Sequence, residues 1–289
     1  MRQRHERGCK LNQPRGTLRM ILLYLPVSAA YLGSAWLEWE RLIQPARTEL
    51  HHRIAIASWL TACALIGHAF LVSSAIVTIA GLDLSLANAL SAVAGMTALF
   101  AWLGSLTRSL PGVVVVALPV AALASWLPFL FANPHRFSFT EEPWAALHIA
   151  VALIAYALLI VATMQALMLM GLQKRLHRGL PEPNAGELPP LLTMEQFLFR
   201  IVGAGFALLT LTLATGIFFS EQLFGKPLTF NYKTVFSVLA WFAFGALLVG
   251  RHRFGWRGRT ALNWILFGSA LLLLAYIGSK FVLEVILRR

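Results

Sequence analysis

The sequence predicts an all-α protein that crosses a membrane as one polytopic bundle of about eight transmembrane helices. Eight stretches are long and apolar enough to span a bilayer, because about 20 apolar residues cross the hydrocarbon core as a helix. The chain of 289 residues is 58% hydrophobic and only 12% charged, with a mean hydropathy of +0.70, which excludes an ordinary soluble globule. The loops between the stretches are short, so we expect a single domain. The stretches are residues 20–39, 54–79, 84–106, 110–131, 145–170, 201–220, 234–250 and 261–286.

A basic segment, residues 1–19, precedes the first stretch and carries six Lys or Arg side chains against Glu6 alone. Apolar residues follow Met20 at once, so we expect translation to start at Met20. Residues 1–19 are then a basic N-terminal extension to one membrane domain, residues 20–289. A secretory signal peptide is the alternative, because a basic region precedes an apolar one. The apolar run continues through Trp36 without a clear A-x-A cleavage site, which favours the first interpretation.

The basic residues also predict how the bundle is oriented. Lys and Arg gather in cytoplasmic loops. The loops after spans one, three, five and seven hold twelve of them, against five in the opposite loops and the C-terminus. We therefore expect these loops in the cytoplasm and both termini on the outer side of the membrane. This distribution accounts for the formal charge of +12 without a nucleic-acid partner, and leaves the lipid bilayer as the expected environment.

Three longer connections separate the spans. Residues 132–144 end in Glu-Glu-Pro-Trp, and Pro143 suits the first turn of a helix, where its missing N–H costs nothing. Residues 171–197 contain four prolines, which interrupt helix. Near the end of this segment Thr193 is predicted to cap a short amphipathic lead-in to the sixth span. Residues 221–233 form an outer loop with a Gly and a Pro.

Two histidines lie within predicted spans and are the candidate site residues. His68 sits near the middle of span two, and His148 lies one turn inside the outer end of span five. Neutral imidazole is a good ligand for haem iron or another metal. The alternative is a histidine that hydrogen-bonds a neighbouring helix. No acidic cluster accompanies the pair, so a haem pocket with His68 and His148 as iron ligands fits better than zinc or copper transport.

Other polar groups have simpler interpretations. Asp83 opens span three, where an acid usually caps the helix. The basic cluster 251–259 could bind phosphate head groups or a partner protein, although anchoring of the helix ends is the simpler role. The chain has no nucleophile–base pair, P-loop or paired carboxylates, so we predict no catalytic residues. Interhelical hydrogen bonds are expected from Asn88, Tyr156, Gln165, Asn263 and Tyr276.

Three segments carry a resemblance to a known family. LHIAVALIAYALLIVATMQALMLM begins at Leu147, PPLLTMEQFLFRIVGAGFALLTLTLATGIFF at Pro189, and GWRGRTALNWILFGSALLLLAYIG at Gly255. They resemble the histidine-led helix, the sixth helix with its lead-in, and the G-W-x-G-x-x-A helix of the cytochrome c assembly family. This family of membrane proteins includes CcsA, CcmF and the HemX-like proteins. The resemblance covers residues 145–280, with a weaker match over 55–105.

The chain departs from the CcsA type in the outer segment W-x-W-D-P-K-E-x-W, which presents haem to apocytochrome in that type. Residues 228–236 correspond to it, and only Lys233 matches. Phe230 and Phe236 keep aromatic character for stacking on haem, while Asn231 replaces the Asp.

The family's histidines are also incomplete. His148 matches the outer histidine of the family's fifth helix, whereas Val249 and Leu82 stand near the positions of two others. His68 has no counterpart among the four.

The resemblance therefore implies a HemX-like accessory protein that binds or handles haem in cytochrome c biogenesis or haem supply. Other assembly or haem-biosynthesis proteins are its expected partners, and complete haem lyase activity is not expected. The alternative is a non-haem regulatory or structural partner of another membrane system, such as an ion transporter. A small-molecule or metal transporter is a weaker interpretation, because intramembrane charges are few.

Overall fold

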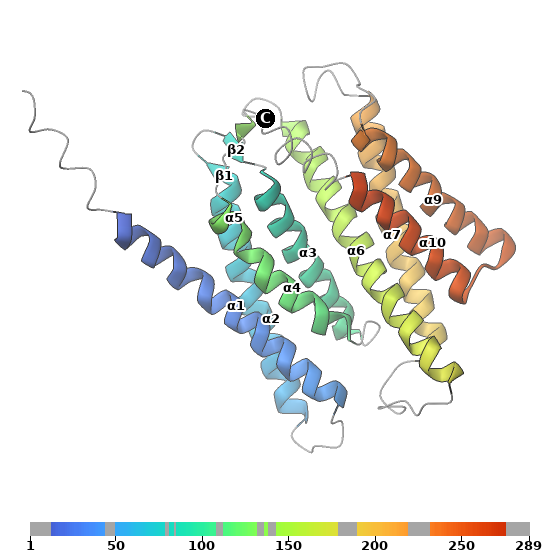
Figure 1. The fold of residues 1–289 in the computed structure, drawn as a ribbon, viewed down its shortest axis with the longest axis horizontal. Helices are drawn as coiled ribbons and strands as arrows, with labels where there is room; N and C mark the ends of the chain where they lie inside the picture. The colour runs from blue at the N-terminus through green and yellow to red at the C-terminus, as the bar shows by residue number, and fades with distance from the viewer. Residues whose placement is uncertain are drawn as a thin grey trace, which may run out of the picture.

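The protein is a bundle of long helices, as the hydropathy pattern predicts (Figure 1). The structure, a computed structural model, describes residues 13–43, 50–78, 81–83, 85–107, 112–131, 136–137, 143–178, 190–218 and 232–275. Seven of the described helices are long and apolar enough to cross a membrane. Without water in the hydrocarbon core, a helix is the form in which one segment satisfies its own backbone.

The first group of helices covers the N-terminal half of the chain. It consists of α1 (Gln13–Ile43), α2 (Leu50–Ile76), α3 (Leu86–Leu106), α4 (Val113–Ser125) and α5 (Leu127–Leu130). Helix α1 packs against α2 and α4, and α3 packs against α2 and α4.

The second group consists of α6 (Pro143–His177), α7 (Leu191–Phe218), α9 (Tyr232–Phe254) and α10 (Gly258–Leu273). Helix α6 packs on α7, on α10 and on α3 of the first group, so it joins the two groups. The described part of α10 begins three residues before the last predicted span, residues 261–286, and overlaps that span through Leu273.

A small sheet lies at one end of the first group. Strands β1 (Val77–Thr78), β2 (Gly81–Asp83) and β3 (Arg136–Phe137) pair antiparallel in this order. The second span was predicted to reach residue 79. The helix instead ends at Ile76, and Val77 and Thr78 form strand β1.

The beginnings of three helices test the predictions about caps. Pro143 is the first residue of α6, as expected. The prediction that Thr193 caps the helix is wrong, because α7 already begins at Leu191. The amide of Thr193 donates to the carbonyl of Pro190 at 2.8 Å, so Thr193 lies inside the first turn. Ser85, rather than Asp83, caps α3.

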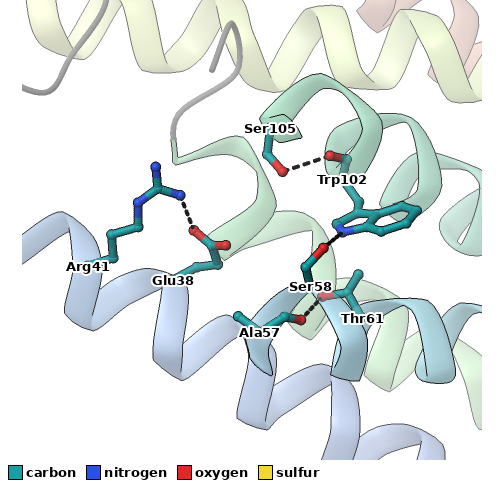
Figure 2. Close-up of polar contacts among 7 residues, drawn as sticks. All are labelled: Glu38, Arg41, Ala57, Ser58, Thr61, Trp102 and Ser105. Carbon is teal, nitrogen blue, oxygen red and sulfur yellow. Dashed lines mark hydrogen bonds and ion pairs between the residues drawn. The ribbon is translucent and has the colours of Figure 1, made fainter. Parts of the chain in front are cut away.

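Interhelical contacts combine small residues with a few side-chain hydrogen bonds. Asn88 of α3 donates from Nδ2 to the carbonyl of Ala75 in α2 at 3.3 Å, which confirms its predicted role. Figure 2 shows a second link, in which the indole Nε1 of Trp102 donates to Oγ of Ser58 at 3.2 Å. Such bonds and close packing, rather than a hydrophobic force, hold helices together in lipid.

The helix ends that flank the connections from α1 to α2, from α6 to α7 and from α9 to α10 lie at the same end of the bundle, toward the lower right in Figure 1. Ion pairs occur there, including Arg53 with Glu40 and Arg251 with Glu195, each at 2.7 Å. These are the connections for which the charge pattern predicts a cytoplasmic location, and that orientation stays a prediction.

Candidate functional site

His68 lies in the centre of the first helix group, with only 1% of its surface exposed. Its Nδ1 is 3.1 Å from the hydroxyl oxygen of Tyr31 in α1, and its Nε2 is 3.0 Å from Oγ of Ser91 in α3. Gly95 of α3 allows the ring this position, since a Cβ there would lie 3.3 Å from the imidazole. The three side chains form a continuous polar chain across three helices.

This arrangement satisfies both ring nitrogens of His68 with hydroxyl groups. A neutral imidazole has one N–H donor and one acceptor nitrogen, and Tyr31 and Ser91 can each serve either role. The contacts match the alternative interpretation of His68, a histidine that hydrogen-bonds neighbouring helices. Ligation of iron by His68 stays a prediction.

His148 occupies a different environment, near the beginning of α6 and facing α7. Its Nδ1 is 2.7 Å from the hydroxyl oxygen of Thr215, and its side chain is half-buried. Gly216 lies beside the ring, because a Cβ there would be 3.4 Å from Cε1 of His148. Lys233, in the first turn of α9, interacts electrostatically with His148. The N-terminal ends of α6 and α9 and the C-terminal end of α7 therefore lie near this histidine.

The hydrogen bonds of Thr215 favour one tautomer of His148. The Thr215 hydroxyl lies 2.8 Å from the carbonyl of Leu211 and 3.1 Å from that of Thr212, and either carbonyl can accept its single proton. With that proton donated to the backbone, the hydroxyl oxygen accepts a hydrogen bond from Nδ1–H of His148. In neutral imidazole, the lone pair that could bind a metal is then on Nε2.

The two histidines thus belong to separate hydrogen-bond groups. His68 contacts α1 and α3, whereas His148 contacts α7. A bis-histidine site formed by both stays a prediction. No group of three or more His, Cys, Asp or Glu side chains that could hold a metal ion occurs among the described residues.

Helix α9 contributes the other predicted site residue that the structure describes. Phe236 lies one turn into α9 and is half-buried, while Phe230 lies outside the described residues. The neighbouring Ser237 hydrogen-bonds the Tyr156 hydroxyl of α6, which confirms the interhelical role predicted for Tyr156. This bond holds α9 against α6 about two turns from His148.

The two positions that correspond to missing family histidines lie near the far end of α9 and in β2. Val249 lies near the opposite end of α9 and is 57% exposed on the surface that lipid would cover. Leu82 is in β2 and pairs with Val77 and Phe137.

Sequence reasoning did not identify Tyr31, Ser91 or Thr215. Each lies in a largely apolar helix that holds several hydroxyl side chains, and many Ser and Thr hydroxyls bond only to their own backbone. Tyr31 offered the clearest signal, because a fully buried phenol needs a partner for its hydroxyl.

Comparisons with known proteins agree with the resemblance. The family model described as cytochrome C assembly protein matches residues 56–287. The inner membrane protein YpjD of Escherichia coli K12 is 38% identical over 178 residues, which cover 61% of this chain and 65% of YpjD. An uncharacterised 28.8 kDa protein of Azospirillum brasilense is also 38% identical, over 50% of this chain and 53% of that protein.

More distant similarity extends to a protein named for its role. The cytochrome c biogenesis protein CcsA of Chlamydomonas reinhardtii is 25% identical over 144 residues, 50% of this chain and 40% of CcsA. The alignments with YpjD and these other relatives span less than two thirds of each relative's length. No solved structure matches this chain.

Proposed function

This chain belongs to the cytochrome c assembly protein family, and on that premise we propose that it is an accessory membrane protein that handles haem. The proposed role lies in cytochrome c biogenesis or in haem supply. We place it in the bacterial inner membrane, as the similarity to YpjD suggests. Other assembly or haem-biosynthesis proteins are its proposed partners.

The contact between His148 and Thr215 is the observation that supports haem binding most directly. With the Thr215 proton donated to the backbone, Nδ1 of His148 is the protonated nitrogen and the Nε2 lone pair is the one suited to iron. A hydrogen bond of this kind at the other ring nitrogen orients a histidine ligand and raises its basicity. The residues present therefore fit a role of His148 as a ligand that would hold haem iron.

Neighbouring residues of α9 extend this fit. Lys233 supplies a cation near His148 that can pair with a carboxylate, and haem carries propionate carboxylates. Phe236 lies one helical turn from Lys233, and its ring, together with that of Phe230, is proposed to stack on the porphyrin. His68, already bonded to two hydroxyls, is the weaker candidate for a second ligand.

The proposed role is an accessory one rather than that of a complete haem lyase. Thioether attachment requires haem to be presented to the cysteines of apocytochrome. Residues 228–236 retain Lys233 alone from the family's presenting segment, and Val249 has no group that can ligate iron. This chain therefore has residues for binding haem but lacks the segment that presents it.

An absorption spectrum tests the proposal. We expect the protein, purified in detergent from haem-replete cells or titrated with haemin, to show a Soret band that His148→Ala weakens or shifts. Circular dichroism of the variant establishes that the bundle remains folded. His68→Ala, measured in parallel, changes the band only if the two histidines share one haem.

A protein that is free of haem and binds no added haemin specifically would contradict the proposal. The second candidate would then apply, a regulatory or structural partner of another membrane system. The hydrogen-bonded state of His68, which needs no cofactor, favours that candidate.

A further inference from the structure

A dense group of exposed cations lies where α6 and α9 end and α10 begins. We define the basic face as Lys174, Arg175, Arg253, Arg257 and Arg259, all of them exposed. The ends of these helices lie toward the lower right of Figure 1, and α10 packs on α6. A Cβ at Gly258 would lie 3.9 Å from Nε2 of Gln173, which joins the turn after α9 directly to the end of α6.

The turn between α9 and α10 is fixed in place by Arg251. Its Nη1 donates to Oε1 of Glu195 in α7 at 2.7 Å and to the carbonyl of Trp256 at 3.3 Å. Its guanidinium carbon also lies 4.4 Å from the centre of the Phe199 ring. The turn is therefore anchored to α7, and the arginines that it carries have a defined position.

Glycines give this turn its shape. Gly255 and Gly258 adopt φ angles of 65° and 56°, in the left-handed region that other residues avoid. Gly250 leaves the space that the Trp256 indole occupies, because a Cβ there would overlap the ring. The amide of Trp256 returns to the carbonyl of Gly250 at 3.2 Å and closes the turn.

Aromatic rings lie beside the cations. Trp256 stacks on Trp264 with 5.5 Å between ring centroids, and Phe254, 74% exposed, stacks on Trp256 at 6.3 Å. Tryptophan is enriched where hydrocarbon meets the polar head groups. The basic face therefore lies at the depth of lipid head groups, beside rings suited to that layer.

The positive charge of this face is not balanced by the part of the protein that the structure describes. Glu195 is the acid that contacts the turn among the described residues, and it is paired with Arg251. Within the described ranges, Arg253, Arg257 and Arg259 form no ion pair. The planar guanidinium group of arginine binds two phosphate oxygens at once. A phosphate group is therefore a suitable counter-charge for this face.

We propose that the basic face binds the phosphate of an anionic phospholipid from the adjoining leaflet. The guanidinium groups of Arg257 and Arg259 hold the phosphodiester, and Arg253 and Lys174 add to its attraction. A zwitterionic lipid carries its own ammonium group, which these cations would repel. The site therefore distinguishes anionic from zwitterionic lipids, and this discrimination is independent of haem binding.

Native mass spectrometry of the full chain in neutral detergent tests the proposal. The probe is an equimolar mixture of dioleoyl phosphatidylglycerol and dioleoyl phosphatidylcholine, and the measured quantity is the ratio of the two lipids bound. We expect the wild type to prefer phosphatidylglycerol. A basic residue near an anionic surface is worth roughly fivefold in affinity, so Arg257→Gln with Arg259→Gln should lower the preference roughly 25-fold.

Two further variants complete the design. Arg41→Gln with Arg53→Gln removes two charges at the same end of the bundle but outside the basic face, so the preference should persist. Arg257→Lys with Arg259→Lys keeps the charge and should retain most of the preference. Equal binding of both lipids by the wild type, or equal losses in the two Gln variants, would overturn the proposal and leave only a general attraction to negative charge. The Soret band should be unchanged in the Arg257 and Arg259 variants. The lipid proposal and the haem proposal can therefore fail independently of one another.

Discussion

The hydroxyl oxygen of Tyr31 in α1 lies 3.1 Å from Nδ1 of His68 in α2, and the two rings meet edge to face with centroids 5.7 Å apart. Ser91 of α3 completes the contact on the other ring nitrogen. Three helices that could otherwise slide along one another are thereby held at one relative height. The energy of this contact can be measured by removing single atoms.

Tyr31→Phe removes only the hydroxyl and should destabilise the protein by about 1 kcal/mol, because a buried imidazole nitrogen loses its partner. The measurement is the unfolding midpoint in mixed detergent micelles. Tyr24→Phe is the matched control, since the Tyr24 hydroxyl forms no hydrogen bond within the described ranges and the ring is also buried. Equal losses in the two variants would show that the bond to His68 contributes nothing.

Thr215→Val keeps the shape of the side chain but removes the acceptor for Nδ1–H of His148. If His148 binds iron, haem affinity should fall roughly 10- to 100-fold, as is typical when a metal-binding histidine loses the hydrogen-bond partner of its other ring nitrogen. Haemin titration followed at the Soret band gives the affinity. Thr212→Val is the control, because the Thr212 hydroxyl bonds the carbonyl of Leu208 instead. An unaltered affinity in Thr215→Val would contradict the assigned orientation of His148.

Gly250→Ala should destabilise the protein by roughly 1–3 kcal/mol, because the added methyl group would overlap the Trp256 ring and force the turn to move. Thermal unfolding in detergent measures the change. Gly171→Ala in α6 serves as the comparison, since a Cβ there meets nothing within 4 Å. The second substitution should be neutral or stabilising by up to about 1 kcal/mol, because alanine favours helix over glycine.

The charge pattern predicts opposite locations for two loops. Reporter domains fused after residue 180 and after residue 225 should report the cytoplasm and the periplasm, respectively. Alkaline phosphatase and green fluorescent protein fusions provide complementary readouts. Two fusions on the same side of the membrane would contradict the proposed orientation.

The proposed accessory role can be tested against lyase activity in a host without its own assembly system. This chain, expressed alone with a reporter apocytochrome c, should yield no covalent haem, because residues 228–236 lack the family's presenting tryptophans. Haem staining of the denatured reporter is the assay. A stained reporter would show that this replacement segment is sufficient for attachment.

Hydropathy predicted the fold because a bilayer leaves few ways to satisfy a backbone. The small sheet escaped prediction, since β1 and β2 have two and three residues at the edges of apolar runs that read equally well as helix. The predicted helix start at Thr193 was wrong for a related reason. A proline can precede a helix as readily as end one, and α7 begins at Leu191, directly after Pro190.

The histidines could be found in the sequence, but their partners could not. His68 and His148 stand out as polar groups in apolar stretches. Which hydroxyl each one meets depends on how neighbouring helices rotate, and Tyr31, Ser91 and Thr215 lie 37, 23 and 67 residues away in sequence. That rotation follows from the packing of many small side chains, which a local pattern does not encode.

Helix α6 is the longest element in the described structure, with 35 residues, and so measures about 52 Å at 1.5 Å per residue. A hydrocarbon core is about 30 Å thick, so α6 must tilt or project beyond it. Its last turn, with Lys174 and Arg175, favours projection at that end. Helix α6 also joins the two helix groups. A mismatch between its length and the thickness of the surrounding bilayer would therefore affect the position of both groups.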